Sequence, residues 1–588
     1  MYKAVLGLLG LIILSCQQSH ATPLRGTPGH HNDAYQIPVL PNQVSDPVGY
    51  YHRKTQLFTL VESEDWPAVV KLATELTRDY QNDGVTWYLL SLGYRQQQQW
   101  QAAIAPLKRA LQLGVRLQRL PKWHDNPNDM MVTLAELYGE LNDKRNAMLW
   151  LERALQARWD DKPALTGRSL FSRKPNPHFV AFAQDDDFRQ LVGAEPESEA
   201  HRDARWRYDL HYLAEEIRRL HVSAFHRMSE QAFERKVAQI DKRIPALNDQ
   251  QVVFELMQLL GMLENGHNFI VPAWGKAGNT QQLPVQFYLF EEGLFIVAAD
   301  SDYRHLIGKQ VLSIGNTPAL RALEKTGVVN PRDNNMQQAW LGPYYLSLAS
   351  VLQGLGIIEH SHEVVVTIRG DDLQTQQLTL TPRAMQFNGF PKLPRQHPQS
   401  EPYWSKLLPE HKALYVNFNA VRERKDVSLD AFNQQLRETL LAGQAKHFIV
   451  DLRDNSGGNG FLLPSTIATA VLFEALVPDG KLMILTGRNT FSAGHDLLMG
   501  ISKLTSAIVV GEPSGTRPNA IGEAGWFTLP YSGQIGVISS QFHQQGAAED
   551  SRVWLAPDLP VALTAKDYFA GTDVVLDAAL ILLSSGSR

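Results

Sequence analysis

A serine at the start of a predicted helix is the strongest candidate nucleophile in this chain. Residues 482–486 form an apolar run, a short polar turn follows, and Ser492-Ala493-Gly494-His495 opens a helical pattern. At a helix N-terminus, the partial positive charge and the unpaired N–H groups stabilise developing negative charge. Serine is also a favoured N-cap residue, so Ser492 taken alone has a structural explanation as well.

Two adjacent glycines after another apolar run could complete a site for an oxyanion. The stretch 451–459 reads Asp-Leu-Arg-Asp-Asn-Ser-Gly-Gly-Asn. Paired glycines let backbone N–H groups turn toward a ligand with no side chain in the way. The N–H groups of Gly457 or Gly458, together with that of Ala493, could therefore hold an oxyanion, each well-aimed donor being worth roughly 3 kcal/mol. A plain turn is the alternative for this stretch.

A third segment makes the combination specific. Residues 509–519 read Val-Val-Gly-Glu-Pro-Ser-Gly-Thr-Arg-Pro-Asn, a strand followed by a glycine-rich loop, and a predicted hairpin comes next. The three segments, in this order, resemble the S41 family of serine peptidases, which shows Asp-Leu-Arg-x-Asn-x-Gly-Gly, then x-Ser-Ala after a strand, then Val-Gly-Glu-x-x-Gly. Pro-Asp-Leu-Pro-Val at 557–561 is similar to the closing motif of the family. The resemblance spans about 200–588 and implies that Ser492 is the nucleophile of a peptidase.

A serine nucleophile needs a base. The tail-specific branch of the family uses a lysine in the glycine-rich loop, where this chain has Arg517, and arginine stays protonated. Similarity to the tricorn and retinoid-binding-protein-like branch implies His267 instead. Its turn, Asn-Gly-His-Asn, departs from the Asp-Gly-His-Thr of that branch at Asn265 and Asn268. His495, one helical turn after the serine, is the alternative base.

A carboxylate normally orients such a histidine. The resemblance points to Glu549, with Asp550 and Glu523 as alternatives. In the implied mechanism Ser492 attacks a peptide carbonyl while His267 takes its proton, and water then hydrolyses the acyl-enzyme. No metal or organic cofactor is required. The rival hypotheses are an esterase with the same residues and a catalytically degenerate scaffold that binds peptides.

The elements that must position these residues alternate between strands and helices. Predicted strands lie at 413–418, 447–452, 481–486 and 507–510, and predicted helices lie at 429–441, 464–476 and 492–504. This alternation indicates an α/β domain with a largely parallel sheet, whose active sites lie at the carboxyl ends of strands. We therefore predict a catalytic α/β domain over 405–588, with the ClpP/crotonase-like core that the family resemblance implies.

The regions before it have different patterns. Residues 200–272 are amphipathic and predict a helical cap, whereas 273–385 are β-rich. Within the β-rich region, 306–316 resembles an edge of PDZ domains. Residues 51–165 carry a helical repeat that resembles the tetratricopeptide repeat, with two copies offset by 44 residues. Such arrays bind peptides or partner proteins, and a helical spacer without a ligand is the alternative.

The N-terminus predicts export. An apolar run at 4–15 ends at Cys16, the single cysteine of the chain, and the ending resembles a bacterial lipobox. The resemblance implies signal residues 1–16, a lipid on Cys16 and an outer-membrane location facing the periplasm. Residues 17–50 then form a flexible tether. An ordinary signal peptide cleaved near Ala21 is the alternative. The net charge of −5 argues against a nucleic-acid partner.

Overall fold

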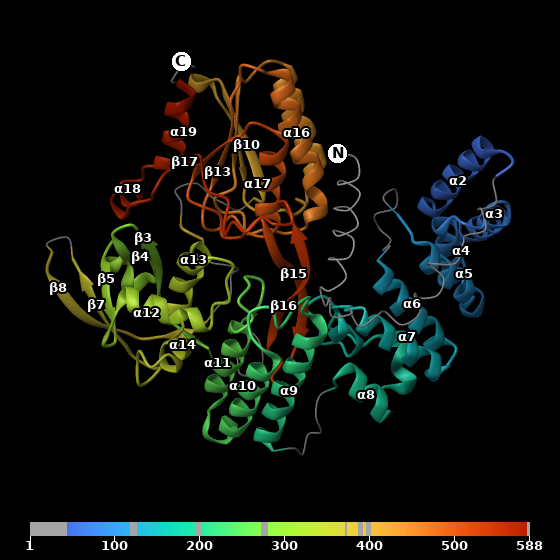
Figure 1. Ribbon diagram of the computed structural model, residues 1–588, viewed down its shortest axis with the longest axis horizontal. Helices are drawn as coiled ribbons and strands as arrows, with labels where there is room; N and C mark the ends of the chain where they lie inside the picture. The colour runs from blue at the N-terminus through green and yellow to red at the C-terminus, as the bar shows by residue number, and fades with distance from the viewer. Residues whose placement is uncertain are drawn as a thin grey trace, which may run out of the picture. The chain divides into compact units, whose positions relative to one another are not determined.

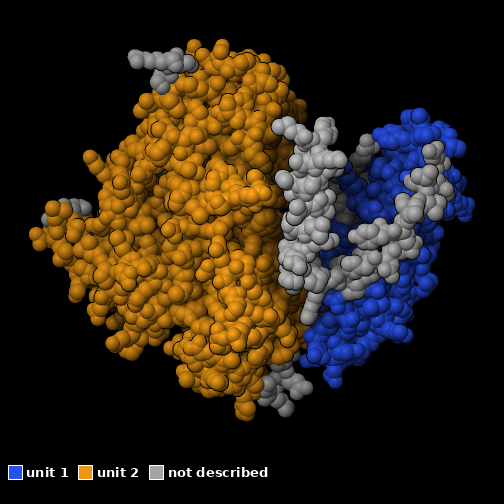
Figure 2. All heavy atoms as spheres, viewed as in Figure 1, with its two compact units in different colours: residues 1–159, 176–191 blue, residues 160–175, 192–588 orange. Residues whose placement is uncertain are grey.

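The computed structural model describes residues 44–117, 126–194, 201–271, 280–370, 373–385, 392–394 and 401–584. The chain forms two compact units, which are residues 1–159 with 176–191, and residues 160–175 with 192–588 (Figure 2). Cys16 and the predicted signal lie outside the described residues, so lipidation stays a prediction. In the ranges given above, no helix is both long and apolar enough to cross a bilayer.

The first unit is helical, as the sequence predicts. Three successive pairs of helices lie among its described residues: α2 (Pro47–Glu62) with α3 (Trp66–Asp79), α4 (Gly84–Gln96) with α5 (Trp100–Leu113), and α6 (Pro127–Glu140) with α7 (Lys144–Gln156). Three residues join the helices of each pair, and an aspartate caps the second helix of the first and third pairs. The alanines of the repeat, Ala103 and Ala147, are fully buried. Membership in the tetratricopeptide class stays a prediction.

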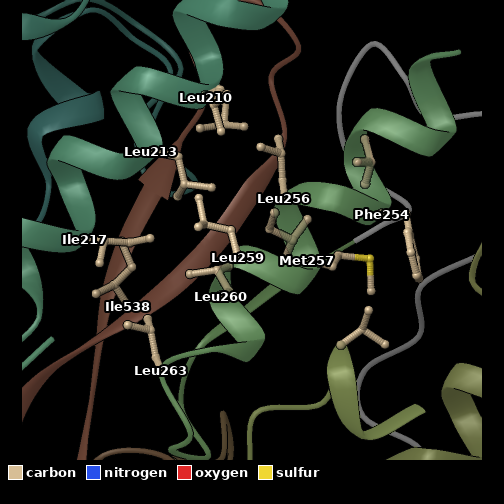
Figure 3. Packing of buried hydrophobic residues seen from close by; sticks show 14 of the residues in the cluster. Leu210, Leu213, Ile217, Phe254, Leu256, Met257, Leu259, Leu260, Leu263 and Ile538 are labelled. Atoms are coloured by element: carbon tan, nitrogen blue, oxygen red, sulfur yellow. The ribbon is translucent and has the colours of Figure 1, made fainter. Parts of the chain in front are cut away.

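The second unit begins with the predicted helical cap. Helices α9 (Arg202–Leu220), α10 (Glu230–Arg243) and α11 (Asp249–Gly261) share one buried apolar cluster. Figure 3 shows leucines of α9 and α11 packed against each other and against Ile538 of strand β16. Helix α11 ends at Gly261, which places the residues 263–268 directly after a buried helix.

A six-stranded antiparallel sheet follows, in which five strands have the order β3-β4-β5-β7-β8 and the short strand β6 pairs with β5. Its strands are β3 (Val285–Phe290), β4 (Gly293–Ala299), β5 (Gln310–Ile314), β6 (Thr317–Pro318), β7 (Val364–Arg369) and β8 (Thr375–Leu380). Helices α12 (Ala319–Lys325), α13 (Asn335–Leu346) and α14 (Ala349–Gly354) lie between β6 and β7 in the chain. The β-rich prediction is confirmed, whereas the PDZ resemblance stays a prediction.

The predicted α/β domain contains a six-stranded sheet of order β10-β11-β12-β13-β14-β17. Its strands are β10 (Tyr403–Leu408), β11 (Ala413–Phe418), β12 (His447–Asp451), β13 (Leu482–Thr486), β14 (Ile508–Gly511) and β17 (Leu559–Pro560). Only the β10–β11 pairing is antiparallel. Every residue of β11, β12 and β13 is buried, as expected for parallel strands covered on both faces.

Helices cover both faces of this sheet (Figure 1). On one face lie α15 (Leu429–Leu441), α16 (Leu463–Leu476) and α17 (Ala493–Leu504), and on the other lies α19 (Val574–Ser584). The predicted strands and helices of this domain are confirmed to within one or two residues.

A long hairpin joins the cap to the α/β domain. Strands β15 (Asn519–Thr528) and β16 (Ile535–Gln544) form a three-stranded sheet with β1 (Phe269–Val271), in which Phe269 lies opposite Val537. Because β1 begins two residues after His267, this pairing fixes the histidine turn against the hairpin.

Candidate active site

Ser492 lies at the first turn of α17 in an unusual backbone conformation. Its φ is 52° and its ψ is −133°, a strained combination for a residue with a side chain, which costs on the order of 1–3 kcal/mol. Although Ser492 occupies the N-cap position, its hydroxyl makes no capping hydrogen bond. Helix capping, the structural reason for a serine at this position, therefore does not account for Ser492. Its hydroxyl is available to act as a nucleophile.

The turn before Ser492 is held by hydrogen bonds within itself and to the residues that follow β12. The Thr490 hydroxyl donates to the carbonyl of Leu452 at the end of β12 (2.9 Å) and accepts the N–H of Gly487 (3.1 Å). The N–H of Phe491 donates to the carbonyl of Asn455 (3.0 Å). The nucleophile turn is therefore fixed to the turn that carries the two glycines.

Gly457 lies directly against the candidate nucleophile. A Cβ atom at position 457 would lie 2.7 Å from Cβ and 3.1 Å from Oγ of Ser492, and its φ of 105° also favours glycine. The N–H of Gly457 donates to Oδ1 of Asn455 (3.0 Å). The N–H groups of Gly458 and Ala493 make no hydrogen bond to any described residue. Of the three predicted oxyanion donors, these two have their protons available for a ligand.

His267 lies beside the residue that precedes the serine. Its ring stacks on Phe491, with ring centroids 4.3 Å apart and planes inclined by 27°, and it is only 8% exposed. Neither ring nitrogen has a hydrogen-bond partner among the described residues. The structure thus places His267 against Phe491, the residue directly before Ser492, without a hydrogen bond between imidazole and hydroxyl. Catalytic hydrogen bonds are often long in free enzymes and shorten when substrate binds.

Burial controls the charge of this histidine. Desolvation, with a smaller contribution from the neighbouring His543, lowers the pKa of His267 to about 3. The imidazole is therefore neutral at physiological pH and has a free lone pair to accept a proton. Because burial disfavours the imidazolium form, His267 can accept a proton only when a nearby negative charge stabilises the imidazolium.

A second imidazole and two carboxylates lie around the same point. A Cβ atom at Gly522 of β15 would lie 3.2 Å from Cε1 of His267 and 3.0 Å from Cδ2 of His543. His543 lies 3.8 Å from the carboxylate of Glu523. Asp496, one turn after Ser492, has a pKa raised by burial and by Glu523, while His543 lowers it. The charges of these carboxylates thus act on His543 and on each other, whereas the pKa of His267 is set by burial and by His543.

The predicted orienting acid does not contact the histidine. Glu549 is exposed in the turn after β16 and makes no ion pair or hydrogen bond with a described residue. The alternative Asp550 forms an ion pair with Arg552 (2.7 Å). Because both nitrogens of His267 are unpartnered, the described contacts assign this role to none of the three candidates, and Glu549 stays a prediction.

The alternative base, His495, is fully buried on α17. Its ring nitrogens have no hydrogen-bond partner in the described part of the chain, and burial, assisted by Arg552, lowers its pKa to about 3. Like His267 it is neutral, but it is closed off from solvent altogether.

The charged residues of the three motifs have structural roles. Arg453 forms ion pairs with Asp451 and Asp573 (both 2.6 Å), which tie the end of β12 to the start of α19. Arg488 forms a two-pronged ion pair with Glu512. Within the described ranges, no group of three or more side chains is arranged to hold a metal ion.

Several residues that hold the histidine turn were not predicted from the sequence. The side chain of Asn265 contacts Nε2 of His221 (2.9 Å) and accepts a hydrogen bond from the Ser539 hydroxyl, and Oδ1 of Asn268 accepts the N–H of Ser539 (2.9 Å). The two departures from the family motif therefore form an amide network with β16. Asp333 also binds this turn, and the N-cap pattern at 334–335 is the one sequence signal that could have drawn attention to it.

No protein-family model matches the sequence, and no curated protein does either. Among solved structures, the chain is similar to mature CPAF complexed with lactacystin, with 11% identity and a TM-score of 0.47 over 65% of this chain and 98% of that one. It is also similar to the photosystem II D1 C-terminal processing protease, with 13% identity and a TM-score of 0.33 over 65% of this chain and 97% of that one. At such identities and TM-scores, these likenesses carry no functional conclusion.

Proposed function

We propose that this chain is an S41-type serine peptidase in which Ser492 is the nucleophile and His267 the general base. The observation that carries this proposal is the conformation of Ser492, whose hydroxyl stands at a helix start in a strained backbone geometry without a capping hydrogen bond. Strained conformations of this kind cluster at active sites. The adjacent Gly457 leaves room for a substrate carbonyl, since any side chain there would strike Ser492.

Catalysis would proceed by acyl transfer. Oγ of Ser492 attacks the carbonyl carbon of a peptide bond while His267 accepts the hydroxyl proton. The carbonyl oxygen becomes an oxyanion near the N–H groups of Ala493 and Gly458, and α17 contributes its N-terminal partial charge. His267 then gives the proton to the leaving amine as the C–N bond breaks. Water repeats these steps to release the acid.

One local movement is required before the first step. The ring of His267 stacks on Phe491 and neither of its nitrogens has a hydrogen-bond partner among the described residues, so in this proposal the ring rotates from Phe491 to bring a nitrogen to Oγ of Ser492. In the step that follows, the developing oxyanion would stabilise the imidazolium, which burial otherwise disfavours.

The expected substrates are proteins or peptides of the bacterial envelope. This part of the proposal rests on the lipobox-like ending at Cys16, which would anchor the enzyme to the outer membrane. The helix pairs of the first unit would contact a protein partner, as helical repeats often do.

The test is reaction with a fluorophosphonate probe and hydrolysis of an unfolded protein substrate such as casein. We expect the wild-type protein to do both and Ser492→Ala to do neither. Ser502→Ala is the matched control, because Ser502 is a half-buried serine on the same helix whose buried hydroxyl has no partner among the described residues. Persistent labelling of Ser492→Ala would contradict the assignment.

The rival hypothesis is a peptide-binding scaffold that has lost catalysis. The specific observation in its favour is that His267 has no hydrogen bond to Ser492 or to a carboxylate. Failure of the wild-type protein to react with the probe, together with retained peptide binding, would favour this hypothesis. Hydrolysis of simple esters without any hydrolysis of casein would instead favour an esterase.

A further inference from the structure

We propose that the start of helix α13 is a clamp that positions His267 against the Ser492 turn, with Asp333 and Arg517 as its charged members. The clamp consists of Asp333, Asn334, Gln337 and Arg517. This inference rests on the proposed function, because it assigns positioning residues to that same site.

One side of the clamp holds the histidine turn by its backbone. Oδ1 of Asp333 accepts the N–H of Gly266 (2.8 Å), and Nε2 of Gln337 donates to the carbonyl of Gly266 (3.0 Å). Oε1 of Gln337 accepts the N–H of Asp333 (2.9 Å), so the two side chains support each other. Both polar groups of the residue directly before His267 are thus fixed by buried side chains.

This side of the clamp also requires a glycine. A Cβ atom at position 266 would lie 2.3 Å from Oε1 of Gln337. The φ of Gly266 is not in the left-handed region, so its backbone conformation does not require a glycine. The close approach of Gln337 does require one, because a side chain at position 266 would collide with it.

The other side of the clamp holds the loop after β14. The guanidinium of Arg517 donates to the backbone carbonyl of Asp333, and Nδ2 of Asn334 donates to the carbonyls of Ser514 (3.1 Å) and Val553 (2.8 Å). Asn334 is also the N-cap of α13, where its Oδ1 accepts two backbone N–H groups. A single helix start therefore binds two loops that are far apart in the chain.

The loop after β14 in turn contacts the nucleophile turn. The N–H of Gly515 donates to the carbonyl of Thr490 (3.0 Å), and the N–H of Ser492 lies 3.4 Å from the hydroxyl of Thr516. The chain of contacts thus runs from Gly266 through Asp333 and Arg517 to the backbone of Ser492. Movement of either loop would change the separation between the base and the nucleophile.

The charges of the clamp are matched. Burial raises the pKa of Asp333 to about 6, while the N–H of Gly266, the Arg517 guanidinium and the Thr516 hydroxyl oppose the rise. The adjacent Arg332 instead donates to the carbonyls of Gly327 and Asn330. Asp333 is therefore ionised at neutral pH, with Arg517 as the cation that stabilises it, and it becomes neutral in mild acid.

The arginine takes on a different role from the lysine of the tail-specific branch. Arg517 cannot act as a base, and its guanidinium instead binds the backbone of Asp333. A position that supplies the base in that branch would here supply a positioning group for a base contributed by another loop.

The test compares Asp333→Ala, Asp333→Asn and Arg517→Met with a matched control, Asp209→Ala. Asp209 is also a buried aspartate with a pKa raised to about 6, and it also accepts backbone N–H groups, from Tyr531 and Ser532 at the tip of the hairpin. The full-length variants are assayed for kcat and KM on a peptide substrate, for melting temperature, and for hydrogen exchange of the peptide that covers residues 262–270.

We expect Asp333→Ala and Arg517→Met to lower kcat by about 10- to 100-fold with little change in KM, the size typical of residues that orient a catalytic group. Both should also speed hydrogen exchange of the histidine turn. Asp333→Asn should recover much of the loss, because an amide oxygen can still accept the Gly266 N–H. Asp209→Ala should lower the melting temperature without changing kcat.

Unchanged kcat and unchanged exchange in folded Asp333→Ala and Arg517→Met would overturn the clamp. If Asp333→Ala does not fold, Arg517→Met decides alone, since it removes a half-buried side chain. If the wild-type protein has no activity, the proposed function fails, and the exchange measurement still decides whether the clamp holds the turn.

Discussion

The two loops that form the candidate site are held in place in different ways. The nucleophile turn, residues 487–493, is fixed to the residues that follow the neighbouring strand β12 by the Thr490 hydroxyl and the Phe491 N–H. The histidine turn, residues 263–268, is fixed by side chains that follow α9, by side chains at the start of α13, and by Ser539 of β16. The position of the nucleophile therefore depends on the sheet, whereas that of the base depends on long-range side-chain contacts.

This difference predicts different responses to substitution. Changes near Ser492 should act by direct steric conflict and abolish activity. Changes near His267 should act by loosening the turn, so their effects on activity should be smaller and accompanied by lost stability.

The largest effect is expected from Gly457→Ala. The added Cβ would lie 2.7 Å from Cβ of Ser492, so the nucleophile must shift, and kcat should fall by about 100-fold or more. Gly443→Ala is the control, because Gly443 also has a positive φ, of 67°, but a Cβ there meets no atom within 4 Å. Steady-state kinetics and circular dichroism of the two variants check this expectation. Equal activity of both variants would show that Gly457 does not crowd the nucleophile.

A smaller effect is expected from Asn265→Ala on the histidine side. The substitution leaves His221, Asn268 and Ser539 without their shared partner, which should cost about 1–3 kcal/mol of stability. Loosening of the turn should lower kcat by about 10-fold.

The buried Asn433 provides the control for this variant. Its side chain donates to the Leu429 carbonyl and to Thr466, away from both loops. Asn433→Ala should therefore cost stability without lowering the kcat of the folded protein. Urea titration measures the stability of both variants, and steady-state kinetics measures their kcat. If the two folded variants have the same kcat, the histidine turn does not depend on the amide network.

The smallest effect on activity is expected from His495→Phe, which tests acid stability. The folded-state pKa of His495, about 3, lies below the unfolded value, so the unfolded chain binds more protons and stability is lost as pH falls from about 6.5 toward 3. In His495→Phe, the free energy of unfolding should therefore fall less steeply as the pH is lowered. Protonation of Asp209 and Asp333, whose pKa values in the folded state are about 6, stabilises the folded protein as the pH falls below 6. The effect of His495 is therefore read from the difference between the variant and the wild type. Identical pH dependence in urea titrations would contradict a neutral, buried His495.

The local part of the site could be predicted from the sequence, and the long-range part could not. The apolar strand 482–486, the polar turn and the helix that begins at Ser492 form a continuous local pattern, and the structure has these elements within one or two residues. The same holds for the strand at 413–418 and the helix at 429–441, where buried runs and a serine cap set the bounds.

The contacts of the histidine turn are set by tertiary structure. Asp333 lies 66 residues after His267 in the chain, and Ser539 lies more than 270 residues after Asn265, so no spacing rule links them. The free hydroxyl of Ser492 could not be foreseen either, because serine at a helix start more often forms a cap. The stacking of His267 on Phe491 likewise depends on tertiary packing between the histidine turn and the nucleophile turn.

The central claim is that His267 serves Ser492 as its base. The most direct measurement is the distance from the ring nitrogens of His267 to Oγ of Ser492 in a crystal structure of the fluorophosphonate adduct. We predict that the phosphorus is bonded to Ser492, that the imidazole has left Phe491, and that one ring nitrogen lies about 2.6–3.2 Å from Oγ or from a phosphonate oxygen. An adduct on Ser492 with His267 still stacked on Phe491 and no nitrogen within reach, or an adduct on another residue, would contradict the account.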